Sequence, residues 1–254
     1  MRAHVLPGAA AVLLSTAALF GCGVGGGPLS ARETSDETRA FEAGGVFTLE
    51  NVNGTVTVET WSEPRVRIEA DKAASTGPLL ERLRVEIEGE GRRVDVRTRM
   101  PRGWLFGGGG KVDYRITLPA DARVRVQTVN GPVEVRGVSG EVKASTTNGS
   151  VEVLDAGGVV EASAVNGGVS ARYRKLDPDG RHRFSTTNGS VTVSVPAGAG
   201  GRLDARTVNG SVGSDLPLET TDRATRRRLE GRLGKGRGLL QLSTVNGSVR
   251  LRPS

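Results

Sequence analysis

Few side chains in the sequence could do acid–base or nucleophilic chemistry. The chain of 254 residues has two histidines and one cysteine, Cys22. His182 occupies a position that is apolar in other copies of an internal repeat, so we interpret it as an interior or edge residue rather than a catalytic base. No nucleophile motif surrounds it. The sequence therefore predicts no catalytic residue, no cofactor and no metal site.

Carboxylates are the remaining candidates for catalysis. A pair of carboxylates flanking a glycosidic bond could hydrolyse a glycan. The aspartates available for such a pair are Asp177, Asp179, Asp204 and Asp215. The first two belong to Asp177-Pro178-Asp179-Gly180, in which each residue type is typical of a turn. A carbohydrate-processing β-helix enzyme is therefore kept as the alternative to a protein without enzymatic activity.

Cys22 ends a segment typical of an exported lipoprotein. Arg2 precedes a mostly apolar run from Val5 to Phe20, which is shorter than the about 20 apolar residues that a transmembrane helix needs. Leu19-Phe20-Gly21-Cys22 resembles the bacterial lipobox. The resemblance implies that residues 1–21 are a lipoprotein signal peptide, and that acyl chains such as palmitate on Cys22 hold the protein on a membrane of the bacterial cell envelope, facing the periplasm or the exterior. The alternatives are a plain signal peptide with an unmodified cysteine, or a short buried helix.

The segment after Cys22 predicts a tether. It begins with six residues of which four are glycine, Gly23 to Pro28, and continues with the polar residues 30–39. A sequence so rich in glycine and polar residues cannot bury enough apolar surface to become ordered on its own. We therefore expect residues 22–43 to form a flexible tether.

The rest of the chain is an internal repeat centred on Asn-Gly. The asparagines of these dipeptides are Asn53, Asn130, Asn148, Asn166, Asn188, Asn209 and Asn246. From Asn130 onward the steps between them are 18, 18, 22, 21 and 37 residues. Apolar residues recur with a period of two on both sides, a valine stands three residues after every asparagine, and a threonine stands two before five of them. Each copy should therefore form two short strands with one apolar face.

Two all-β architectures are compatible with this repeat. In an antiparallel meander or sandwich, each Asn-Gly would close a hairpin, for which it is a strong signal. In a parallel β-solenoid, a flattened β-helix, each copy of about 18–22 residues would form one coil with Asn-Gly at a corner. We favour the solenoid over residues 44–252, because stacking places like residues above like residues. A narrow interior of Val and Ala would also explain an aromatic content of only 4%.

Two segments interrupt the repeat. Between Asn53 and Asn130 we expect longer strands at residues 65–70, 83–88, 93–99 and 112–118, around a loop that starts at Met100. The Arg-rich segment from Thr221 to Leu233 predicts a short helix. At the end of the chain, Arg250, Arg252 and Pro253 are expected to protect the last open strand edge from pairing.

The repeat carries a resemblance to a known family. The recurring Thr-x-Asn-Gly-Ser-Val-x-Val unit, the lipobox before it and the closing Thr-Val-Asn-Gly-Ser-Val-x-Leu resemble the bacterial "putative adhesin" family of β-strand repeat proteins, a domain of unknown function. The similarity covers roughly residues 44–252. It implies a β-solenoid on the outside of a bacterial cell, in some members encoded with envelope stress systems, and it implies no catalytic residue.

Two groups of side chains are candidates for contact with a partner. The first is a basic run with Glu230 as its one acid, in a chain of formal net charge +7. Its members are Arg223, Arg226, Arg227, Arg228, Arg232, Lys235 and Arg237. Such a run could contact an anionic surface, and a solvated face is the alternative. The second group, Trp104, Leu105 and Phe106, could make an apolar contact or cover one end of the coils.

Taken together, the sequence predicts a non-enzymatic, lipid-anchored β-solenoid of the cell envelope that acts as a binding, adhesion or structural module. Its predicted partners are the membrane, through Cys22, and an envelope glycan, anionic lipid or another envelope protein. Nucleic acid is not expected, because no base-stacking aromatic residues accompany the basic run. A self-associating envelope scaffold is a further alternative.

Overall fold

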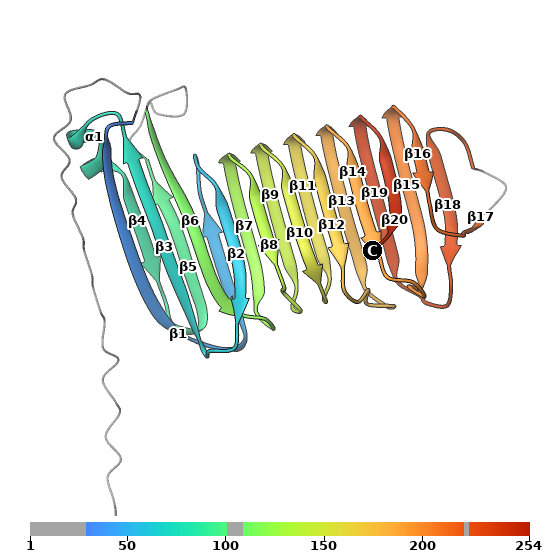
Figure 1. Cartoon of the computed structure of the whole chain (residues 1–254), viewed down its shortest axis with the longest axis horizontal. Coiled ribbons are helices and arrows are strands. Elements are labelled where there is room, and N and C mark those ends of the chain that lie inside the picture. Colours follow the sequence, from blue (N-terminus) through green and yellow to red (C-terminus); the bar gives the residue numbers. More distant parts are fainter. Residues whose placement is uncertain (1–28, 101–108, 221–223) are drawn as a thin grey trace, which may run out of the picture.

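The computed structural model describes residues 29–100, 109–220 and 224–254. Strands lie side by side along the long axis of the molecule, with one short helix, α1 (Gly77–Arg82), near the N-terminal end of the row (Figure 1). The strands form two sheets, which we call sheet A and sheet B. The repeat passes from one sheet to the other at every Asn-Gly.

Both sheets follow the long axis of the molecule. Sheet B contains, in spatial order, β4 (Arg84–Glu88), β5 (Gly91–Arg99), the second half of β1 (Ala31–Glu50), β7 (Arg123–Asn130), β9 (Val142–Asn148), β11 (Val160–Asn166), β13 (Arg181–Asn188), β19 (Leu239–Asn246), β15 (Gly201–Asn209), β18 (Arg228–Leu233) and β17 (Glu219–Thr220). Sheet A contains the first half of β1, β3 (Arg65–Ala74), β6 (Gly110–Pro119), β2 (Val56–Trp61), β8 (Val133–Arg136), β10 (Val151–Ala156), β12 (Val169–Tyr173), β14 (Val191–Val195), β20 (Val249–Pro253) and β16 (Val212–Ser214).

The coils of the repeat stack in parallel and in register. In sheet A, Val133 lies beside Val151 and Val151 lies beside Val169. In sheet B the asparagines align in the same way, as Asn148 does with Asn166. The parallel solenoid is therefore confirmed, and the antiparallel meander is wrong for the repeat. Asn-Gly forms a corner between the two sheets rather than the turn of a hairpin.

The narrow interior is filled by stacked aliphatic side chains. Val124, Val142 and Val160 are fully buried at one such level of sheet B, as are Val151 and Val191 in sheet A. Because every coil contributes a similar side chain at each level, the core is a ladder of Val, Ala and Leu. The largest buried side chains include Phe41, Phe47, Phe184 and Tyr173. The expected interior of Val and Ala is confirmed along the repeat, and these few aromatic side chains are exceptions to it.

The Asn-Gly corners are joined by a ladder of side-chain amides. Asn130 donates from Nδ2 to Oδ1 of Asn53 at 2.7 Å, and the same contact repeats from coil to coil at 2.7–2.9 Å. The glycine that follows allows the coils to approach closely. At Gly167, where φ is +151°, a Cβ atom would lie 1.9 Å from the carbonyl oxygen of Gly149. Glycine at this corner is therefore a steric requirement of the stack.

The expected tether over residues 22–43 is wrong from Ala31 onward. Residues Ala31–Glu50 form one long strand, β1, whose first half pairs antiparallel with β3. This half is polar and contributes little to the core, yet Asp36 accepts hydrogen bonds from Arg67 and Glu33 forms an ion pair with Lys72. A polar segment that cannot order itself alone is ordered here because it adds to the edge of an existing sheet.

The longer strands expected before Asn130 are confirmed as β3, β4, β5 and β6. Here the pairing becomes mixed, since β3 runs antiparallel to β6 and β4 runs antiparallel to β5. Helix α1 follows β3 and packs against it and against β1. Leu80 of this helix and Leu83 after it are buried. The helix thus adds apolar side chains to the N-terminal end of the core.

The last coil of the chain is inserted between two earlier coils. Strand β19 pairs with β13 on one side and β15 on the other, while β20 lies between β14 and β16. In Figure 1 the red β19 and β20 stand between their orange neighbours. The expectation that Arg250, Arg252 and Pro253 protect an open edge is therefore wrong, because β20 has a neighbour on both sides.

The helix expected from Thr221 to Leu233 is also wrong in its described part. Residues Arg228–Leu233 form strand β18, which runs antiparallel to β15. Leu229 and Leu233 point inward and are half-buried and buried, whereas Arg228 and Arg232 are exposed. This alternation of inward leucines and outward arginines has a period of two, which is typical of a strand and not of the helix expected from the arginine content.

Candidate binding face

Four hollows lie along the outer face of sheet B and run into one another. Their volumes are about 500, 400, 250 and 640 Å³. The first two lie over the same strands, β1, β7, β9 and β11, at different positions along them, and the third and fourth continue toward the C-terminal coils. The first two share Ser145 and Ser163, the second and third share Lys143 and Glu161, and Leu239 lines both the third and the fourth. We call this continuous depression the sheet B groove. It crosses the strands and follows the axis of the solenoid.

The alternation along each strand decides which side chains line the groove. In β13, His182, Phe184 and Thr186 are buried, while Arg181 and Arg183 face outward. Because the coils are in register, outward residues of successive strands fall into rows along the axis. One row on the outer face of sheet B, here called the serine row, consists of Ser145, Ser163, Ser185 and Ser243. Ser145 and Ser163 line the first two hollows, and Ser185 and Ser243 continue the row beyond them. It offers one hydroxyl per coil, at the strand spacing of about 4.8 Å.

A row of β-branched side chains borders the serine row on the side of the Asn-Gly corners. This valine–threonine row consists of Val129, Thr147, Val165, Thr187, Val245 and Val208. Among the described residues, the exposed large hydrophobic side chains are Val165, Val208 and Val245, at 43, 55 and 40% exposure. One edge of the groove is thus apolar.

Arginines border the opposite side of the serine row. The groove arginines are Arg125 on β7, Arg181 and Arg183 on β13, Arg202 on β15 and Arg232 on β18. All five are exposed. No carboxylate in the described part of the chain lies within ion-pair distance of any of them, whereas Lys143 on the same face pairs with Glu141 and Glu161. Six carboxylates also line the groove, namely Glu50, Glu141, Glu161, Asp204, Glu219 and Glu230. All except Glu219 pair with Arg97, Lys143, Arg206 or Arg228, so the five groove arginines remain outside these ion pairs.

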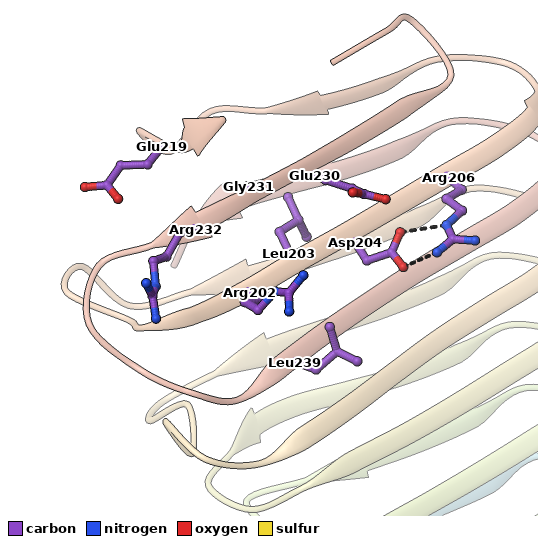
Figure 2. Close-up of a pocket in the computed structure, with 9 residues that line it drawn as sticks. All are labelled: Arg202, Leu203, Asp204, Arg206, Glu219, Glu230, Gly231, Arg232 and Leu239. Carbon is purple, nitrogen blue, oxygen red and sulfur yellow. Dashed lines mark hydrogen bonds and ion pairs between the residues drawn. The ribbon is translucent and has the colours of Figure 1, made fainter. Parts of the chain in front are cut away.

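The largest hollow, at the C-terminal end of the groove, shows this most clearly. Arg202 and Arg232 lie opposite each other in the antiparallel pair of β15 and β18. In Figure 2, dashed lines join Asp204 to Arg206, while none reaches Arg202 or Arg232. Arg206 donates hydrogen bonds to the Asp204 carboxylate, and these raise the pKa of the Arg206 guanidinium above its usual value. On its other side, Arg232 lies opposite Glu219 of β17, which also lines this hollow but is beyond ion-pair distance. Two guanidinium groups that face each other, neither of them in an ion pair with a carboxylate, favour an anionic partner.

The interior position expected for His182 is confirmed. Its side chain is 2% exposed, and its Nδ1 atom lies 2.8 Å from the hydroxyl of Tyr173. Burial lowers the pKa of the imidazole, and the backbone carbonyl of Asp177, 3.4 Å from Nε2, acts in the opposite direction more weakly. A histidine enclosed in this way is a core residue and not a base for a substrate in the groove.

The four aspartates considered for catalysis are scattered. Asp177 and Asp179 lie in the turn before β13, where the amide N–H of Asp179 donates to the Asp177 carboxylate. Asp204 faces out of sheet B, and Asp215 follows β16 of sheet A, where it pairs with Arg252 at 3.7 Å. Of these four residues, only Asp204 lines one of the four hollows of the sheet B groove. Asp204 lies opposite Glu230 across the strand pair, but each carboxylate is held by an arginine of its own strand, Arg206 and Arg228.

The basic run does not form one patch. Arg228 and Arg232 reach the outer face of sheet B, but Arg228 pairs with Glu230 and only Arg232 is a groove arginine. Arg226 and Arg227 precede β18, and their carbonyls accept hydrogen bonds from Val212 and Thr207. Lys235 and Arg237 lie in the loop between β18 and β19, where Lys235 is exposed and Arg237 pairs with Asp179 at 3.2 Å.

Several predicted site residues lie outside the described residues. These are Cys22, Trp104, Leu105, Phe106 and Arg223. Among the described residues, no group of three or more His, Cys, Asp or Glu side chains is placed to hold a metal ion. None of the helices in that part of the chain is long and apolar enough to cross a membrane.

Sequence reasoning missed most of the groove. Arg125, Arg181, Arg183 and Arg202 stand in different copies of the repeat, and none belongs to a charge run. Alignment of the copies on their asparagines would have shown them as outward positions on one side. What the alignment could not show is which of them keep a carboxylate neighbour.

The described residues thus form a parallel β-solenoid with a groove along sheet B that is lined in part by arginines. The chain belongs to the Toastrack family, DUF4097, whose sequence profile matches residues 113–252, more than half of its length. A search of curated proteins finds no match.

A comparison with solved structures finds similar chains at low sequence identity. A "putative cell adhesion protein" from Clostridium sporogenes matches 87% of this chain and 100% of its own, with a TM-score of 0.52 and 11% identity. A "putative adhesin" from Bacteroides fragilis matches 88% of this chain and 98% of its own, with a TM-score of 0.37 and 10% identity. The first of these supports the fold, and at such identities neither assigns a ligand.

Proposed function

We propose that the protein is a non-enzymatic, lipid-anchored module of the bacterial cell envelope, which uses the sheet B groove to bind an anionic partner of the envelope. The observation that carries the proposal is the continuous groove with five exposed arginines that form no ion pair within the described residues, while all but one of the carboxylates that line it are paired with other cations. The names of the C. sporogenes and B. fragilis structures, which refer to adhesion, are in keeping with a binding role.

The anchor in this proposal comes from the sequence. Leu19-Phe20-Gly21-Cys22 provides the lipidation motif, and residues 23–30 separate Cys22 from the first strand at Ala31. Eight residues can span at most about 25–30 Å when fully extended. The proposal therefore places the N-terminal coils close to the membrane, with the long axis of the solenoid free to point away from it.

Expression of the full chain with its own leader in a bacterial host tests the anchor. The wild type and a Gly25→Ala control should incorporate labelled palmitate and fractionate with membranes, because neither alters the lipobox cysteine. The Cys22→Ala variant should lose the label and leave the membrane fraction. A Cys22→Ala variant that remains in the membrane fraction, beside a wild type that takes up no label, would overturn the anchor.

A further inference from the structure

We propose that the sheet B groove binds a linear acidic polysaccharide, laid along the axis of the solenoid with its carboxylates toward the groove arginines. This inference rests on the proposed binding function and names the chemical class of the ligand. Three rows of the groove carry it, and each matches a different part of such a polymer.

The groove arginines match the charges of the polymer. Arg125 and Arg183 lie in one outward row, which also contains Lys143 and Glu161 between them. Arg181, Arg202 and Arg232 lie in the next row, where Leu239 separates Arg181 from Arg202. The cations are therefore spread along the axis rather than gathered at one point. A guanidinium group binds a carboxylate through two parallel hydrogen bonds, which favours carboxylates repeated along a chain.

The serine row matches the neutral hydroxyl groups of sugar rings. Ser145, Ser163, Ser185 and Ser243 are half-buried, and Gln127 and Gln241 add amides at the same face. Hydroxyls and amides both donate and accept hydrogen bonds. A polymer that carried charges alone would leave these groups to water, whereas a sugar chain can bond to them.

The valine–threonine row matches the C–H face of a pyranose ring. Val165 and Val245 are substantially exposed although every coil has space for polar residues at this position. Contact with a ring would remove their methyl groups from water, which is favourable. Along the strands of sheet B, the outward groups thus change from methyl groups to hydroxyls and then to cations. An acidic sugar ring likewise carries C–H groups, hydroxyls and a carboxylate.

The shape of the groove favours a chain over a membrane surface. The hollows form a depression that joins coil to coil, and its lining includes the buried residues Val126 and Ala144 at the bottom. A flat bilayer cannot enter such a depression, but a single polymer strand can. Because the serine row places a hydroxyl on each of four neighbouring coils, about 4.8 Å apart, the face suits a ligand that repeats in the same direction.

Calorimetry on the full chain, purified from membranes in an uncharged detergent, tests the inference. The probe is polygalacturonate, a linear polyuronate, and its fully methyl-esterified form is the matched uncharged probe. Further probes are inorganic polyphosphate and phosphatidylcholine vesicles that contain phosphatidylglycerol. The vesicles are offered to the Cys22→Ala chain in buffer without detergent, so that no acyl chain of the protein can insert into them. We expect binding of polygalacturonate that weakens as salt is added, with no measurable binding of the ester, the polyphosphate or the vesicles.

Variants of the groove have controls of equal chemistry on sheet A. Arg125→Gln with Arg183→Gln should weaken binding of polygalacturonate about tenfold or more, since two charge-assisted contacts are lost. Arg115→Gln with Arg250→Gln makes the same charge change on the outer face of sheet A, where both side chains are exposed, and should leave affinity unchanged. Ser163→Phe should block the groove, whereas Ser170→Phe in the next strand of the same coil should not.

Each contrary result has a distinct meaning. Equal effects of the sheet A and sheet B pairs, or equal binding of polyphosphate, would overturn the inference, because charge alone would then account for the binding. Binding of the vesicles without polygalacturonate would overturn it in favour of a membrane surface. Binding of the ester that is sensitive to Ser163→Phe would overturn the acidic ligand and keep the groove as a binding face. No binding of any probe by a folded chain would overturn the inference, while the palmitate experiment decides the anchor separately.

Discussion

Asn246 donates a hydrogen bond from its side-chain amide to Oδ1 of Asn188 at 2.8 Å, although 58 residues separate the two in the chain. On its other side, Asn246 accepts a hydrogen bond from Asn209, also at 2.8 Å. The coil formed last along the sequence is thus bound into the amide ladder between two coils formed earlier. The ladder records the spatial order of the coils rather than their order in the chain.

Replacement of Asn246 should therefore cost more than replacement of the asparagine that ends the ladder. Asn246→Ala removes two amide contacts and Asn209→Ala removes one. With about 1 kcal/mol net for each hydrogen bond, we expect losses of about 2 and about 1 kcal/mol in the free energy of unfolding. Urea denaturation measures both. Equal losses would contradict an ordering in which Asn246 is internal and Asn209 terminal.

Two adjacent glycines at one corner should differ strongly in how much stability the fold loses when each is replaced by alanine. Gly167→Ala places a Cβ atom 1.9 Å from the carbonyl oxygen of Gly149, at a φ of +151°. At Gly168 the nearest atom to a new Cβ, the carbonyl oxygen of Ser190, is at 3.5 Å, an ordinary contact distance. We expect Gly167→Ala to destabilise by about 4 kcal/mol or more, or to prevent folding, and Gly168→Ala to change stability by less than about 1 kcal/mol. Thermal unfolding followed by circular dichroism provides the measurement. Similar melting temperatures for the two variants would contradict the close approach of coils.

The same corners explain why so much of the fold could be predicted from the sequence. A steric requirement for Gly167 and an amide contact at Asn166 recur in every coil, so both residue types recur at fixed offsets. The first half of β1 has no such signature, because its order comes from backbone pairing with β3 and from ion pairs such as that of Asp36 with Arg67. Pairing partners of that kind are decided in space and leave no local pattern in the sequence.

The position of the last coil and the groove could not be predicted for a related reason. The copy at Asn246 resembles the others equally well, so nothing local shows that it enters between Asn188 and Asn209. The groove depends on that insertion, because Leu239 of the inserted coil lies between Arg181 and Arg202 in the same outward row. Local patterns establish which residues face outward, and only the stacking order establishes which of them are neighbours.

Two threonines at the corners allow a hydroxyl that donates a hydrogen bond to be compared with a buried hydroxyl that has no partner. Thr146 donates to the carbonyl oxygen of Gly131 at 3.0 Å, while the buried Oγ1 atom of Thr128 has no hydrogen-bond partner. Thr146→Val should therefore cost about 1–2 kcal/mol, because it removes a bond and leaves a buried carbonyl with one contact fewer. Thr128→Val should be neutral or stabilise by about 1 kcal/mol, because it removes an unpaired polar atom. Urea denaturation of the two variants against the wild type measures the difference, and a loss at Thr128 as large as that at Thr146 would contradict it.

Mild acid should destabilise the fold through His182. Burial lowers the pKa of this imidazole below the value of 6.5 that it has in the unfolded chain. The unfolded chain therefore takes up a proton first as the pH falls, so the stabilisation is fully present above pH about 6.5 and decreases below it, down to the pKa of the folded state. The slope can reach about 1.4 kcal/mol per pH unit for one proton. Asp36 and Asp95, whose ion pairs with arginine lower their pKa, lose their contribution in a separate window, below the usual carboxyl range.

The His182→Leu variant isolates this effect. Leucine occupies the equivalent interior position in the two strands that follow in space, as Leu240 in β19 and Leu203 in β15, so the core can accept it. The variant leaves the Tyr173 hydroxyl without its 2.8 Å partner, a loss that does not vary over this pH range because burial also raises the pKa of Tyr173 far above it. We expect the free energy of unfolding, from urea denaturation, to fall between pH 7 and pH 5 in the wild type and to stay nearly constant in the variant. The same slope in both proteins would show that a group other than His182 binds the proton.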